Sequence, residues 1–242
     1  MFTAPRTTAG FEPLFNKVGF APNPVPYELT PNTAFDKGDM VVLTYGKVAK
    51  ATSASVSGIL GVMAQAVAQA DNPAAELTKG LVYDNPNTVF RVSIADMDNR
   101  DYTATGGASA GTTVTAAEAV LTTANVFRGA MLYVYEGPNA GSIRTVSAYA
   151  NANDVGTWTV TYPFPVQCTT ATKFIVFGAG SEAQDAINVG SVGIVLKDEA
   201  RVDGDAAIIS SAVPVGPLVC VGLNPANLWM DVMIRASKHL LG

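Results

Sequence analysis

A serine near the middle of the chain stands in a motif that hydrolases use for a nucleophile. Gly107-Ala-Ser-Ala-Gly111 matches G-x-S-x-G, and later aspartates followed by His239 keep the order Ser, Asp, His. A nucleophile elbow needs a buried strand directly before the serine, because the sharp turn from strand to helix exposes its hydroxyl. Residues 100–106 are polar and unpatterned, and Thr112-Thr-Val-Thr115 follows the motif. This context excludes a serine nucleophile.

A glycine-rich stretch, Gly178-Ala-Gly-Ser-Glu-Ala183, matches the G-x-G-x-x-A pattern of dinucleotide-binding proteins. Asp198 stands 20 residues after Gly178, where an acid that binds a ribose is expected (198 minus 178). However, Gly190 limits the following helix to about eight residues. Only 44 residues remain after Asp198 (242 minus 198), too few for a doubly wound sheet. We therefore predict a plain loop between two modules and no cofactor.

Acidic residues gather in Asp96-Met-Asp-Asn-Arg-Asp101, at the spacing that opens a calcium loop. The sixth position, where an EF-hand needs glycine, is Asp101, and the twelfth is Gly107 rather than glutamate. The stretch is not an EF-hand; a solvated loop and an irregular calcium loop both stay open. His239 is the only histidine and has no second histidine or cysteine cluster near it in sequence. We predict no catalytic residue and no metal ligand, and we expect that the protein is not an enzyme.

The composition narrows the partners. The chain has 242 residues, 48% of them hydrophobic and only 14% charged, which predicts a folded chain with a sizeable core. A net charge of −5 gives no basic surplus for nucleic acid. The longest apolar run, residues 58–70, contains two glutamines and is too short for a membrane span. The two cysteines, Cys168 and Cys220, predict buried residues rather than a disulfide framework. Because the first residues lack the pattern of a secretory signal, we expect a soluble protein made in the host cytoplasm.

Short β-branched runs bounded by Gly, Asn and Asp dominate the sequence after residue 35 and predict an all-β fold. Tyr45-Gly46 is the expected turn of the first hairpin, since Gly46 tolerates a positive φ. The expected strands fall into two sets that form one barrel or sandwich domain, residues 35–95 plus 185–242. These strands are 40–43, 47–51, 58–63, 81–83, 88–94, 192–197, 207–210, 218–222 and 228–235.

Residues 96–184 are expected to form an inserted β-module. It would start with a long polar loop, 96–115, and continue with strands at 130–135, 143–149, 157–162 and 173–177. Helix is scarce: a capping box at 115–118 and a segment at 181–188 are the two candidates. Nine of the 20 aromatic residues lie in residues 127–177. We expect most of them in a core, with an aromatic face around Trp158 that binds glycan or a receptor as the alternative.

Residues 1–34 hold six of the 14 prolines and no helical or strand period, which predicts an extended N-terminal arm. The arm also carries four phenylalanines, whereas a solvated linker would be rich in Gly, Ser and charge. These rings are expected to dock either on a neighbouring subunit or on the chain's own domain. The predicted partner-binding residues are Phe2, Phe11, Phe15 and Phe20.

Four stretches together resemble the small β-domain of tailed-bacteriophage capsid decoration, or cement, proteins. They are Gly38-Asp-Met-Val-Val-Leu43, Gly46-Lys-Val-Ala-Lys-Ala51, Gly58-Ile-Leu-Gly-Val62 and Val89-Phe-Arg-Val-Ser93. The resemblance covers about 60 residues. It implies a trimeric protein on the outer surface of the virion shell that bridges major capsid subunits, with its arm lying along the shell. The inserted module departs from this compact pattern and leaves a head fibre or spike as the alternative.

Overall fold

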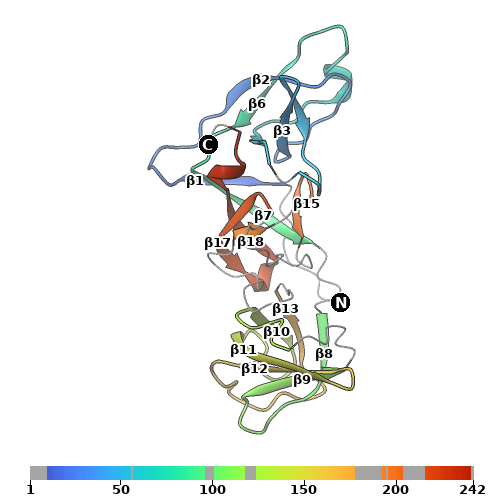
Figure 1. Cartoon of the computed structure of the whole chain (residues 1–242), viewed down its shortest axis with the longest axis vertical. Helices are drawn as coiled ribbons and strands as arrows, with labels where there is room; N and C mark the ends of the chain where they lie inside the picture. The colour runs from blue at the N-terminus through green and yellow to red at the C-terminus, as the bar shows by residue number, and fades with distance from the viewer. Residues whose placement is uncertain are drawn as a thin grey trace.

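The computed structural model describes residues 10–55, 57–95, 101–117, 124–177, 192–194, 196–203 and 216–240. These residues form strands and turns, with helix limited to short 3-10 segments at Gln69–Asp71, Pro225–Asn227 and Ala236–Lys238. The prediction of an all-β protein is confirmed. Figure 1 shows that the strands form three groups along the long axis of the molecule. No helix among the described residues has the length and apolar character needed to cross a membrane.

The first group is an antiparallel five-stranded sheet that curls almost into a barrel. Its two outer strands meet because Leu29, directly after one of them, forms a bridge with Val48 in the other. The expected hairpin turn is present: Tyr45 and Gly46 both have positive φ values, 50° and 79°. In order across the sheet the strands are β2 (Val25–Glu28), β6 (Lys79–Tyr83), β5 (Ile59–Met63), β3 (Met40–Thr44) and β4 (Lys47–Lys50).

The central group is a seven-stranded sheet built around β7 (Thr88–Ala95). One edge of β7 pairs with β18 (Trp229–Ile234), and its other edge pairs with β1 (Glu12–Asn16) and with β16 (Arg201–Asp203), which runs parallel. The remaining strands are β14 (Val192–Ile194), β15 (Leu196–Asp198) and β17 (Leu218–Asn224).

The third group is a closed antiparallel barrel of six strands, all of which lie inside the range 96–184. Its interior is aromatic, with Trp158 against Tyr102, Phe127, Tyr149 and Phe174 at centroid distances of 4.7 to 5.6 Å. Around the barrel the strands are β10 (Met131–Glu136), β11 (Ile143–Ala152), β12 (Val155–Val160), β9 (Thr113–Ala117), β8 (Asp101–Gly106) and β13 (Lys173–Val176).

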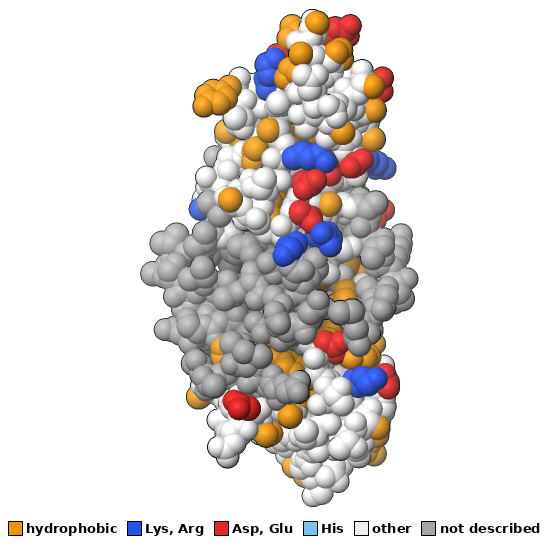
Figure 2. All heavy atoms as spheres, turned by 90° about the vertical axis from the view of Figure 1, so that its right-hand side faces the viewer, with side chains coloured by type: hydrophobic (Ala, Val, Ile, Leu, Met, Phe, Trp, Pro, Cys, Tyr) orange, Lys and Arg blue, Asp and Glu red, His pale blue; other side chains and the backbone are white. Residues whose placement is uncertain are grey.

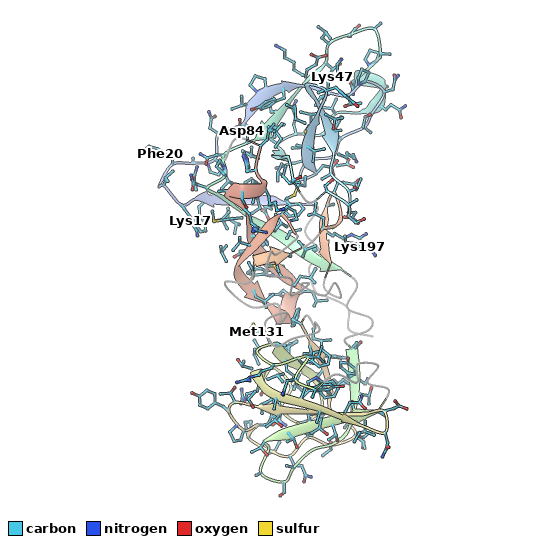
Figure 3. All side chains as sticks on the ribbon, viewed as in Figure 1. Lys17, Phe20, Lys47, Asp84, Met131 and Lys197 are labelled. Atoms are coloured by element: carbon cyan, nitrogen blue, oxygen red, sulfur yellow. The ribbon has the colours of Figure 1, made fainter. Side chains whose placement is uncertain are left out.

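One buried cluster joins the three groups. Met40 and Ile59 of the five-stranded sheet, Phe90 of the central sheet, and Ile175 and Phe177 of the barrel all belong to it. Met131, which packs against the same cluster, lies at the end of the barrel that faces the central sheet (Figure 3). The groups therefore share a continuous core.

Two sequence expectations are corrected. The range 96–115 is not one long loop, because β8 and the start of β9 lie within it; residues 96–100 are outside the described part of the chain. The capping box at 115–118 is wrong, because Thr115 to Ala117 belong to β9. In both places buried Tyr102, Ala104 and Val114 alternate with outward threonines, and the threonines made these strands look like a polar loop.

The N-terminal segment is extended, as predicted, but from residue 10 onward it belongs to the chain's own sheets. β1 pairs with β7, and β2 pairs with β6. Residues 1–9 lie outside the described residues, as do the expected strand at 207–210 and the expected helix at 181–188.

Candidate partner-binding surface

The motifs that resemble enzyme sites do not form one where the structure describes them. Ser109 lies exposed in the loop between β8 and β9, so a strand follows it instead of the helix of a nucleophile elbow. The motif at 178–183 falls outside the described residues. Asp198 accepts hydrogen bonds from Arg201 and from the backbone of Ala200, so turn contacts occupy its carboxylate.

Acidic side chains in the described ranges are used for internal contacts. Asp101, the last acid of the 96–101 stretch, accepts a hydrogen bond of 2.6 Å from the hydroxyl of Tyr135. Burial and this hydrogen bond raise the pKa of Tyr135 above its ordinary value. No group of three or more His, Cys, Asp or Glu side chains there is arranged to hold a metal ion.

The two cysteines are buried, as predicted. Burial raises the pKa of both thiols, that of Cys220 to about 12. A thiol with a raised pKa stays protonated at neutral pH and is a poor nucleophile.

The aromatic residues of the barrel fill its interior. Trp158 and Tyr149 are buried and therefore cannot hold a glycan in the native barrel, which overturns the role considered for Trp158. Tyr162, in the loop after β12, is 74% exposed and is the ring of this module that solvent reaches most. The expectation of an aromatic core is confirmed for this part of the chain.

The four predicted partner-binding phenylalanines have different surroundings. Phe2 lies outside the described residues. Phe11 is 1% exposed and packs in the buried cluster with Phe90, so it is a core residue and not a contact for a partner. Phe15 on β1 and Phe20 in the loop after it are exposed. The structure therefore leaves two of the four rings available on its described surface.

The anchor of the N-terminal segment explains why Phe11 is inside. Gly10 has a φ of 76° and lies so close to Gly38 that a Cβ would stand 2.7 Å from its backbone. The amide of Phe11 donates a hydrogen bond of 2.8 Å to the carbonyl of Gly38. This contact fixes the segment to the five-stranded sheet immediately before β1 begins.

Two further apolar side chains accompany the exposed rings. We call Phe15, Val18, Phe20 and Val25 the apolar loop patch; they are between 37% and 75% exposed and lie within eleven residues of the chain. Phe20 is at the outer end of the loop between β1 and β2 and points away from the body of the molecule (Figure 3). A projecting loop with several exposed large apolar side chains is typical of a surface that a partner covers.

The base of this loop is held in place by Asn16, which is buried. Its backbone carbonyl accepts a hydrogen bond of 3.0 Å from Gly19, and its side-chain oxygen accepts one of 3.4 Å from Val18. The amide of Lys17 donates to the carbonyl of Asn87 at 3.0 Å. Pro22 and Pro24 fix further backbone angles in the loop. A loop restrained in this way loses less conformational entropy when it binds.

Sequence reasoning identified the two exposed phenylalanines but missed the valines. Val18 precedes a glycine and Val25 stands between two prolines, and neither pattern separates an exposed valine from a buried one. The signal that could have found Val25 is the P-V-P sequence itself, which is typical of an edge strand.

Comparison of the chain with protein-family models, with curated proteins and with solved structures finds no match.

Proposed function

We propose that the chain is a structural virion protein that binds the outside of a phage capsid and stabilises it by bridging major capsid subunits. The observation that carries the proposal is the apolar loop patch. Burial of a side chain such as Phe20 by a partner contributes about 1.5–3 kcal/mol. Because each contact adds binding free energy only to the assembled shell, it stabilises that shell by mass action.

The sequence resemblance supports the same proposal. Three of the stretches that resemble decoration proteins form β3, β4 and β5, which are neighbours in one sheet. This arrangement agrees with the small β-domain that the resemblance implies. The elongated molecule in Figure 1 has a length suited to contacts with more than one subunit.

Co-sedimentation with capsid particles of the source virus tests the proposal. We expect the wild-type chain to pellet saturably, near one copy per capsid subunit, and Phe20→Ser to weaken binding about tenfold. Tyr45→Ser is the matched control, because Tyr45 is fully exposed at the β3–β4 turn, outside the patch. No pelleting of the wild-type chain would refute capsid binding, whereas equal binding of Phe20→Ser would remove the loop from the contact.

Truncation must respect the fold. Removal of residues 1–27 would delete β1, most of β2 and the core residue Phe11, so its effect on binding could not be separated from unfolding. Removal of residues 1–9 keeps Gly10 and Phe11 in place and tests whether the preceding residues add to shell affinity.

The alternative of a head fibre or spike predicts a different stoichiometry. Saturation at a few copies per particle would favour it over a cement that covers the shell. A glycan- or receptor-binding module is the remaining alternative, and the exposed ring of Tyr162 is where it would be tested, by oligosaccharide titration of Tyr162→Ser against the wild-type chain.

A further inference from the structure

Three neighbouring strands of the barrel carry the same outward pattern, a threonine on each side of one buried residue. β8 has Thr103 and Thr105, β9 has Thr113 and Thr115, and β12 has Thr157 and Thr159; we call these six residues the threonine face. Thr157 pairs with Thr115 and Thr159 with Thr113 across β12 and β9. The hydroxyl of Thr105 donates to that of Thr115 at 3.1 Å. The six side chains therefore form one continuous hydroxyl-bearing surface.

The threonine face is unusual because charge is missing from it. Asp101, at the start of β8, is the one charged residue in β8, β9 and β12, and its carboxylate accepts a hydrogen bond from Tyr135. Figure 2 shows the barrel end, at the bottom of the view, as mainly uncharged. Threonine is favoured in any strand, but natural exposed strands usually add lysine or other charges that prevent association. The absence of such charges indicates a surface that is covered in use.

We infer that the threonine face is a contact between two copies of this chain. A hydroxyl both donates and accepts hydrogen bonds, so a hydroxyl face is complementary to a second copy of itself under a two-fold axis. The net charge of −5 makes two copies repel each other in most orientations. A face without charge is where two copies approach with the least repulsion, and interface cores are depleted of charge for the same reason.

The size of the face predicts a weak contact. Three strands at about 4.8 Å spacing, two outward residues deep, cover on the order of 200 Å². A stable interface needs about 800 Å² on each partner. In dilute solution the pair should dissociate, but copies held side by side at high effective concentration would associate. That setting rests on the proposed function; the contact itself is tested without any capsid.

Sedimentation equilibrium of the full chain at concentrations up to about 1 mM tests the inference. We expect reversible self-association of the wild-type chain that is insensitive to salt, because no charges meet in the contact. Thr115→Lys and Thr115→Glu should each weaken it at least about tenfold. Thr170→Lys is the matched control, since Thr170 is exposed in a barrel turn outside the face. Circular dichroism of each variant checks that it is folded.

A mixture of the Lys and Glu variants gives the sharpest result. If the face meets itself, equal amounts of Thr115→Lys and Thr115→Glu should associate where neither does alone, and salt should weaken this mixed pair. A wild-type chain that stays monomeric over the whole range would overturn the inference. So would association that persists in both Thr115 variants, or that is lost in Phe20→Ser instead, because the contact would then lie elsewhere.

Discussion

Lys50 joins parts of the chain that are far apart in sequence. Its ammonium lies 2.9 Å from the buried carboxylate of Asp39 and 3.1 Å from Glu199, next to β15 in the central sheet. Burial raises the pKa of Asp39, although hydrogen bonds from Asp36 and Lys50 and the charge of Lys50 lower it. Asp39 thus remains a carboxylate at neutral pH only at a cost that Lys50 reduces.

Removal of the cation in Lys50→Met should therefore destabilise the protein by about 2–3 kcal/mol at neutral pH. This is the low end for a broken buried pair, because 26% of the Lys50 side chain remains exposed. Without Lys50 the folded-state pKa of Asp39 rises further, so the folded state takes up a proton more readily and the loss shrinks as the pH falls. Urea unfolding at neutral and acidic pH measures both effects. Lys47→Met, which breaks a more exposed pair with Glu28, should cost less than about 1 kcal/mol; an equal loss would contradict the argument.

His239 gives the pH dependence of stability a single histidine source, since the chain has no other. Burial lowers its pKa from 6.5, while the charge of Asp84 and backbone hydrogen bonds at Leu60 and Asp84 act in the opposite direction. The unfolded state therefore binds more protons below pH 6.5, and the free energy of unfolding should fall on acidification from about pH 7.5 to 5.5. His239→Leu should remove that part of the slope. Denaturation of both proteins over the same pH series tests this, and identical slopes would exclude a role for His239.

At the scale of elements, Gly61 explains one motif of the sequence. A Cβ at this position of β5 would lie 2.0 Å from the carbonyl oxygen of Tyr83 in β6. The backbone cannot yield cheaply, so Gly61→Ala should cost about 3 kcal/mol, the upper end for overpacking. Gly46→Ala is the control: its φ is 79° but nothing lies within 4 Å, and we expect a loss of about 1 kcal/mol. Thermal unfolding ranks the two, and equal losses would show that β6 moves aside.

The elements that sequence reasoning found are those with uninterrupted β-branched or apolar runs, such as β3, β7, β11 and β18. Their buried residues alternate or run continuously, and this pattern is local. β8 and β9 were missed because their outward residues are threonine and their buried ones include alanine, so the hydrophobic contrast is small. β1 and β2 contain prolines, which their edge positions tolerate, and only their partners in space make them strands.

At the scale of the molecule, the candidate surface was predictable only in part. Phenylalanines in a proline-rich segment indicated docking, and Phe15 and Phe20 are indeed exposed. Phe11 has the same sequence surroundings, yet the close approach of Gly10 to Gly38 places it in the core. That contact joins residues 28 positions apart (38 minus 10), so no local pattern could distinguish Phe11 from Phe20.

The shared core predicts that the three groups of strands unfold together. The chain's two tryptophans report on different groups: Trp158 inside the barrel, and Trp229 on β18 of the central sheet, where the Arg91 guanidinium lies 3.5 Å from its ring centroid. In Trp229→Phe the fluorescence follows the barrel, and in Trp158→Phe it follows the central sheet. Because Phe177 continues the cluster of the central sheet into the barrel, the fluorescence midpoint in urea should equal the circular dichroism midpoint within each variant. A barrel that melts at a lower urea concentration than the whole chain would mean that this cluster does not couple the groups. A molecule that bridges two partners through separate groups transmits load between them only if they are coupled, so the same measurement bears on the proposed bridging role.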